Sequence, residues 1–247
     1  MTRAAGIDLS KHNGSFDPYS AVKPIDFVIQ RLSWAMNPDE KITEIFRGVS
    51  QFERRLAYHY YSTGAPWKDQ ANLFLDMQVG KKFKCLIVDY EHLYNNLNRK
   101  TAEDLEKFLW YLVEQRPGKK VIGYSGTYVY RDFIAYYVDL SMFDWWMARY
   151  PWIPAPQTGK PKYPLGLTYV KRPWKKWQYS KTGKGSLYGC ASRYVDLNVF
   201  NGTVEELETW LGMDEPEPEP VTPPIPLSCE QRVTKLEGWA VGLGFEK

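Results

Sequence analysis

The 247-residue sequence contains few of the residues that build disulfide scaffolds and metal sites, with only three cysteines and three histidines. The cysteines are Cys85, Cys190 and Cys229, and the histidines are His12, His59 and His92. Neither set has a metal-ligand spacing, and three cysteines cannot all pair within one chain. We therefore expect no disulfide framework, no metal and no other cofactor.

Long apolar runs and dense basic stripes are also missing. No stretch approaches the ~18 consecutive apolar residues of a membrane span. The formal net charge is only +3, but residues 214–247 hold seven acids against three bases, so they carry −4 and the remaining 213 residues carry +7. A mildly basic body favours an anionic partner such as a cell-wall polymer. Nucleic acid is the weaker choice because the basic residues form no stripe, and we expect no nucleic-acid partner.

Aromatic residues are abundant instead, at 16% of the chain, with 10 Trp and 18 Tyr. Sugar rings stack their C–H faces on flat side chains, so a carbohydrate site is one destination for this excess. A core and surface rich in tyrosine is the other explanation.

Eight short segments have the pattern of β-strands. They are residues 6–10, 26–34, 55–62, 85–91, 120–126, 145–150, 175–180 and 195–200. Helical patterns separate the early ones, at residues 38–52, 66–79, 101–116 and 127–140. The clearest is 101–116, where Thr101 and Asp104 resemble a capping box and Gly118 marks the end.

Alternating strands and helices predict an α/β fold with a mainly parallel sheet, and eight strands suggest closure into a barrel. Residues 151–174 and 181–194 show no helical period, so we expect an irregular TIM-like barrel with eight strands and about five helices. We assign residues 1–212 to the barrel.

The end of the chain has a different composition. Residues 213–226 alternate Pro and Glu, which predicts an extended linker. Residues 227–247 carry a short heptad-like apolar stripe, which predicts a short helical tail. The tail could join chains into a homo-oligomer, dock on the barrel or be frayed, and glycines weaken it as a free helix.

Carboxylates stand at the ends of predicted strands. In LIVDYE (86–91) an apolar run ends in Asp89 and Glu91, which share a face because strand side chains alternate. Asp8 lies on the first predicted strand and Asp196 on the last, and these strands become neighbours when a barrel closes. All four acids could therefore meet in one cleft at the mouth. The alternative is that each is a separate solvated cap.

Crowded carboxylates cannot all ionise cheaply, because an anionic neighbour raises the proton affinity of the next acid. One acid can then stay protonated near neutral pH while another stays charged. Cleavage of a glycosidic bond requires such a pair.

Seven motifs support a resemblance that extends over roughly residues 5–211. In order they are GIDLSKHNG, YHYY, VDYE, GYSG, WWMARY, WQYS and VDLNVF. Together they resemble the family 25 glycoside hydrolases, the lysozymes of the cellosyl and phage endolysin type. The resemblance implies an irregular eight-stranded barrel and N-acetylmuramidase activity on the β-1,4 bond between N-acetylmuramic acid and N-acetylglucosamine in peptidoglycan.

The resemblance also implies roles for the acids. Glu91 matches the general acid and Asp89 its partner carboxylate, while Asp8 and Asp196 match supporting acids. Asp89 could attack the anomeric carbon or could orient the substrate's own acetamide, which then attacks. We favour the second route, and both retain the anomeric configuration.

Aromatic and amide side chains in the motifs are candidates for sugar binding. They are Tyr60, Tyr124, Trp146, Tyr150 and Gln178. Packing in the barrel core is the alternative for each. The connection 151–174 is expected to form one wall of the groove.

A phage or prophage endolysin is the leading interpretation of the whole chain. The opening MTRAAGIDLS lacks the apolar core of an export signal, so we expect the protein in the host cytoplasm or a virion before it acts on the wall. A glycan-binding barrel without turnover and a hydrolase of chitin-like polymers are the alternatives.

Overall fold

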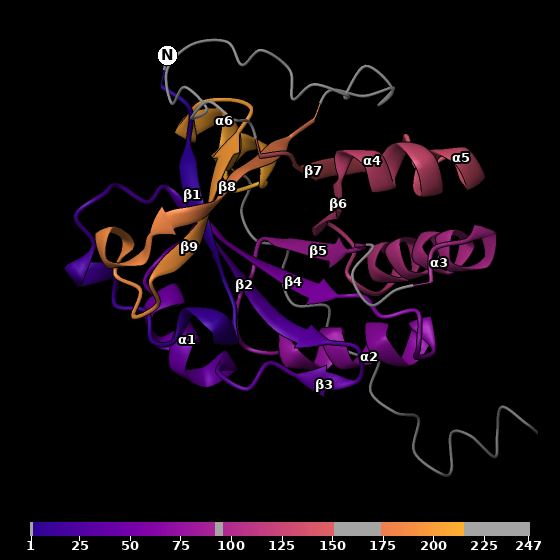
Figure 1. Cartoon of the computed structure of the whole chain (residues 1–247), viewed down its shortest axis with the longest axis horizontal. Helices are drawn as coiled ribbons and strands as arrows, with labels where there is room; N and C mark the ends of the chain where they lie inside the picture. The colour runs from indigo at the N-terminus through magenta and orange to yellow at the C-terminus, as the bar shows by residue number, and fades with distance from the viewer. Residues whose placement is uncertain (1, 92–95, 151–173, 215–247) are drawn as a thin grey trace, which may run out of the picture. The chain divides into compact units, whose positions relative to one another are not determined.

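The computed structural model describes residues 2–91, 96–150 and 174–214 (Figure 1). Each of the eight expected segments forms a strand. They are β1 (Ala5–Leu9), β2 (Phe27–Trp34), β4 (Arg55–Tyr60), β5 (Cys85–Asp89), β6 (Lys120–Gly126), β7 (Asp144–Ala148), β8 (Lys176–Lys184) and β9 (Tyr194–Phe200). They pair in that order, and β1 also pairs with β9, which closes the barrel. A two-residue strand, β3 (Asn37–Pro38), pairs with the end of β2. The predicted fold class is confirmed.

The last strand runs against its neighbours. All barrel pairings from β1 through β8 are parallel, but β9 is antiparallel to both β8 and β1. A parallel return needs a crossover of about a dozen residues or more, and residues 185–193 are too few for one. The first half of β9 therefore lies at the same end of the barrel as the carboxyl ends of the other strands.

The helices cover the outside of the barrel (Figure 1). They are α1 (Ile42–Val49), α2 (Trp67–Met77) and α3 (Arg99–Gln115), followed by a composite helix of α4 (Thr127–Val129), a π-helical segment (Tyr130–Ile134) and α5 (Ala135–Tyr137). The four helical patterns are thus confirmed with shifted ends. A further helix, α6 (Val204–Trp210), follows the barrel.

The start of α3 corrects one detail. Asn98, not Thr101, is the capping residue: its side chain accepts a hydrogen bond from Thr101 N at 3.1 Å, and Thr101 Oγ1 accepts one from Asn98 N at 3.0 Å. Asp104 bonds instead to two lysines one turn away. Asn is an equally good cap, so the Thr-x-x-Asp pattern placed the helix start too late.

Strand alternation divides the core into two clusters. Leu86 and Val88 of β5 face the helices, while Ile87 faces the barrel interior with inward residues of the other strands. The interior cluster also includes Leu207 and Leu211, so α6 packs on the barrel at the end where β1 begins (Figure 1). The opposite end, where Asp89 finishes β5, is left for the site.

The compact unit that contains the barrel extends to Asp214. The predicted linker (213–226) and tail (227–247) lie almost wholly outside the described residues, so their boundaries and the homo-oligomer remain predictions. None of the described helices combines the length and apolarity needed to cross a membrane.

Candidate active site

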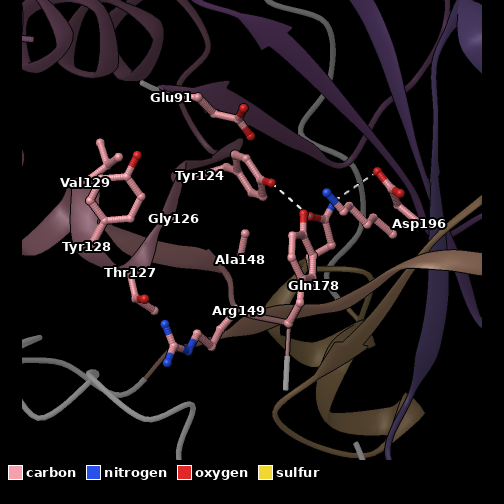
Figure 2. Close-up of a pocket in the computed structure, with 12 residues that line it drawn as sticks. Glu91, Tyr124, Gly126, Thr127, Tyr128, Val129, Ala148, Arg149, Gln178 and Asp196 are labelled. Carbon is pink, nitrogen blue, oxygen red and sulfur yellow. Dashed lines mark hydrogen bonds between the residues drawn. The ribbon is translucent and has the colours of Figure 1, made fainter. Parts of the chain in front are cut away.

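The four predicted acids come together at the mouth of the barrel. Asp8 and Asp196 are direct partners across the β1–β9 pairing. Asp89 is the last residue of β5, and Glu91 follows two residues later. Glu91 and Asp196 line a pocket of about 780 Å³ (Figure 2). The geometry unites the acids, while their catalytic roles remain predictions.

Asp8 is the best-anchored acid. Its Oδ2 accepts hydrogen bonds from Asn198 Nδ2 at 2.8 Å and from Gln178 Nε2 at 2.9 Å. Burial raises its pKa to about 6, even though the two amides and the charge of Arg31 act in the opposite direction. Asp8 therefore gains or loses its proton near neutral pH.

Asp196 and Asp89 have their proton affinities raised by burial and by the other acids. Burial, followed by the charges of Asp8 and Glu91, raises the pKa of Asp196 to about 8, with Lys181 opposing. Burial and then Glu91 and Asp8 raise the pKa of Asp89 well above its usual value, with Arg31 opposing. These four acids cannot all be charged together near neutral pH.

Glu91 is held in place by the residue before it. Tyr90 points to the opposite side, where its hydroxyl bonds to Thr101 Oγ1 at 2.8 Å, and its carbonyl accepts from Ser125 Oγ at 2.8 Å. Burial raises the pKa of Glu91, Asp8 raises it further, and a hydrogen bond with Tyr124 opposes them. Burial and Asp8 thus shift Glu91 towards its protonated form, which is the form that a proton donor needs.

Gln178 connects the acids to two tyrosines. Its Oε1 accepts from the hydroxyls of Tyr124 at 2.9 Å and Tyr150 at 2.6 Å. Its Nε2 donates to Asp8 at 2.9 Å. The same Nε2 donates to Asp196 at 3.4 Å (Figure 2). Because all its amide positions are engaged by side chains, Gln178 orients the acids in this structure. Sugar binding by Gln178 remains a prediction.

The aromatic candidates divide into two groups. Tyr124 and Tyr150 line the pocket, and Tyr60 is half-buried beside Asp89 on the adjacent strand. Trp146 corrects the expectation: only 2% of it is exposed, and its Nε1 donates to Asn198 Oδ1 at 2.9 Å. Its ring packs 4.3 Å from that of Tyr124, because Trp146 is one inward position deeper in β7 than Ala148. Core packing is the role that the structure shows for Trp146.

Several site residues were missed from the sequence. Asn198 could have been found, since it lies two residues after Asp196 and so shares its face. Arg31 also carries a signal, because it is a charge inside the apolar run of β2. Arg149 and Lys181 line the pocket wall, and nothing in their local pattern marks them.

Among the histidines, His59 lies on the outer face of β4, as strand parity predicts. Its Nδ1 pairs with Ser33 Oγ at 2.8 Å and its Nε2 with Gln70 Oε1 at 3.1 Å. Burial lowers its pKa to about 4, so it is a neutral core residue. His92, and all of the predicted groove wall 151–174 except the buried Trp174, lie outside the described residues.

The family model of the glycosyl hydrolases family 25 matches residues 7–187. The chain belongs to this family. Membership makes the protein a glycoside hydrolase of the kind that acts on peptidoglycan.

Relatives of known sequence give a consistent result. The uncharacterized protein YegX of Escherichia coli O6:H1 (strain CFT073) is 34% identical over 222 residues, which cover 82% of this chain and 71% of YegX. The E. coli K12 form is 32% identical over 225 residues, covering 83% and 72% of the two chains.

Solved structures share the fold. A family 25 glycosyl hydrolase from Bacillus anthracis superposes with a TM-score of 0.69 at 24% identity, covering 84% of this chain and 93% of that one. The catalytic domain of endolysin ply40, from bacteriophage P40 of Listeria monocytogenes, has a TM-score of 0.65 at 22% identity, covering 85% and 98%. A muramidase from Acremonium alcalophilum has a TM-score of 0.63 at 18% identity, covering 86% and 100%. At these identities the likeness shows the fold alone.

Proposed function

We propose that the chain is a lysozyme, a 1,4-β-N-acetylmuramidase that cleaves the bond between N-acetylmuramic acid and N-acetylglucosamine with net retention. The observation that carries the proposal is the gathering of Glu91 and Asp89, with Asp8 and Asp196, at one pocket in a family 25 barrel. The muramidase from Acremonium alcalophilum, a structural neighbour, supports it.

In the proposed reaction, protonated Glu91 gives its proton to the leaving glycosidic oxygen. Ionised Asp89 accepts a hydrogen bond from the acetamide N–H, so that the acetamide oxygen can attack the anomeric carbon from the opposite face. Water then opens the resulting ring, with Glu91 now acting as the base. Two displacements at one carbon give retention.

The alternative route makes Asp89 the nucleophile. The two routes leave different intermediates, since only direct attack joins the sugar covalently to Asp89. A 2-fluoro sugar substrate would trap that ester for mass spectrometry. If the enzyme cleaves peptidoglycan but the 2-fluoro sugar does not label Asp89, the result supports attack by the acetamide of the substrate.

The charge of the pocket wall supports an acidic wall polymer over a chitin-like one. Arg149 and Lys181 are both exposed and line the same pocket as Glu91. Peptidoglycan bears carboxylates on its lactyl groups or stem peptides, whereas chitin bears none. Opposite charge raises the local concentration of such a substrate.

The deciding experiment compares the full chain with its Glu91→Gln variant on purified peptidoglycan. We expect the variant to lose ~10²–10⁴-fold in rate, the usual contribution of a general acid. Glu44→Gln, which removes an exposed charge on α1, is the matched control and should remain active. Unchanged lysis by Glu91→Gln would refute the proposed mechanism.

The products identify the bond. After borohydride reduction, muramitol at the new ends supports a muramidase, whereas reduced N-acetylglucosamine supports the chitin-like alternative. Binding of the wall without new reducing ends would support a glycan-binding barrel instead.

We further propose that the protein is a phage or prophage endolysin, held in the host cytoplasm or a virion before release. One structural neighbour is the catalytic domain of a phage endolysin. Cells that express the chain in their cytoplasm should remain intact until the membrane is permeabilised, and then lose turbidity. The light-scattering mass of the full chain, compared with residues 1–212, tests whether the tail forms oligomers.

A further inference from the structure

Arg31 brings a buried positive charge to the floor of the acid cluster. It belongs to β2, beside β1 and β4, and only 9% of it is exposed. Its Nε donates to Asp39 Oδ2 at 2.7 Å. The side chain of Asp39 is fully buried and also accepts from the backbone amides of Lys11 at 3.1 Å and Lys41 at 2.9 Å. Arg31 is therefore anchored at the Nε side of its guanidinium.

Beyond that anchor, the guanidinium retains a donor that makes no hydrogen bond. Arg31 Nη2 is a buried donor without a partner, and Asp89 Oδ1 is a buried acceptor without one. Asp8 receives two amide hydrogen bonds, whereas the carboxyl of Asp89 has no hydrogen-bond donor among the described residues. Ionisation of Asp89 is thus favoured by a nearby charge and by no hydrogen bond from the described residues.

The groups that surround Arg31 and Asp89 come from every neighbouring element. Those that interact electrostatically with one or both are Asp8, His12, Asp39, Tyr58, Glu91, Tyr124 and Asp196. Burial and three acids raise the pKa of Asp89, and Arg31 is the group that opposes them. Glu91 instead responds to burial, Asp8 and Tyr124. The cation therefore acts unequally on two carboxyls only two residues apart.

We propose that Arg31, anchored by Asp39, is a positioning residue that opposes the burial and the three acids around Asp89, so that Asp89 can give up its proton while Glu91 carries one. The inference rests on the proposed function, because it assigns a cause to the division of roles between the two acids. Without the cation, Asp89 would compete more strongly with Glu91 for a proton. The enzyme would then be distributed over inactive protonation states.

The test is the pH profile of kcat/KM for the full chain on peptidoglycan. The acidic limb reports ionisation of Asp89 and the alkaline limb reports loss of the Glu91 proton. Arg31→Met should move the acidic limb to higher pH by about one unit or more, as expected when an opposite charge is lost, and should leave the alkaline limb in place. The maximal rate should fall at least ~10-fold, because the correct protonation state becomes rare.

Two variants separate charge from structure. Arg31→Lys keeps the charge and should return the acidic limb towards its original position, while Asp39→Asn loosens the anchor and should shift the limb in the same direction as Arg31→Met, but less. Arg54, which pairs with Glu208 and caps the carbonyl of Asp26 at the other end of the barrel, supplies the control. Arg54→Met should change the melting temperature without moving either limb.

The outcomes are distinguishable. An active wild-type enzyme whose Arg31→Met variant keeps the acidic limb, or shifts both limbs equally, overturns the role of Arg31 and leaves the proposed function intact. If Arg31→Lys does not return the acidic limb towards its original position, the positive charge of residue 31 is not the cause of the shift. A wild-type enzyme that releases no reducing ends from peptidoglycan refutes the proposed function itself.

Discussion

At the scale of single residues, the neighbours of a carboxyl group decide what it can do. Asp8 has two amide donors, Asp89 has none among the described residues, and Glu91 has one tyrosine, although all three belong to one cluster. The sequence could predict which acids meet, since strand position determines that. It could not predict their hydrogen bonds, because these come from Gln178 and Asn198 on strands distant in sequence.

The charge of Asp8 should influence the proton on Glu91. Asp8 raises the pKa of Glu91, so Asp8→Asn should lower it and move the alkaline limb of kcat/KM to lower pH. Asp76→Asn, an exposed substitution on α2, is the control and should leave the profile unchanged. An alkaline limb that moves to higher pH in Asp8→Asn would contradict this effect of Asp8 on the pKa of Glu91.

Trp146 shows where residue-level prediction failed. The alternation of side chains along a strand shows that Trp146 and Ala148 share a face, but it does not give the depth of a residue along the barrel axis. Trp146 lies one inward step below Ala148, and there the interior is closed by Tyr58 and Tyr124. A tryptophan at the mouth would contact sugar, whereas at this depth it packs the core.

At the scale of elements, apolar alternation was enough to find every barrel strand, but not their directions. The reversal of β9 follows from the length of residues 185–193, which sequence periodicity does not measure. The helix α6 was also missed, although Thr203 and Glu206 form a capping box that announces it. Short helices offer too few turns for a periodic signal.

The cap of α3 gives an element-level prediction. Asn98→Ala removes the acceptor for the Thr101 amide and should lower the free energy of unfolding by ~1 kcal/mol. For a chain of this size that corresponds to a fall of about 2–4 °C in melting temperature, measurable by calorimetry. Asn98→Asp keeps the acceptor and should stay within about 1 °C of wild type. Equal losses in both variants would exclude the cap as the cause.

At the scale of the whole molecule, the site lowers the stability of the fold as pH rises. The folded-state pKa of Asp8 is raised to about 6 and that of Asp196 to about 8, both from 3.8. An acid whose pKa is higher in the folded state than in the unfolded state stabilises the fold fully below its unfolded-state pKa. That stabilisation is lost as the pH rises through its folded-state pKa. The relevant window therefore extends from about pH 4 to pH 8.

We accordingly expect the free energy of unfolding in urea to fall between about pH 4 and pH 8, and Asp196→Asn to flatten this slope. Burial lowers the pKa of Lys176, whose Nζ has no hydrogen-bond partner, from 10.5 to about 8. Its ionisation therefore makes stability rise with pH, but only above about pH 8. Lys176→Met removes the lysine contribution above about pH 8 and should leave the slope from the acids below it unchanged. A Lys176→Met variant that is more stable at the alkaline end of this range than at the acidic end would contradict the assignment.

The meeting of β1 with β9 also bears on how the protein is made. Asp8 belongs to the first strand of the barrel to be translated and Asp196 to the last, and the two become partners only when β1 pairs with β9. A nascent chain that has not reached Phe200 has neither a sealed ring nor its complete set of acids. The cluster of four acids can therefore form only after the whole barrel has been translated.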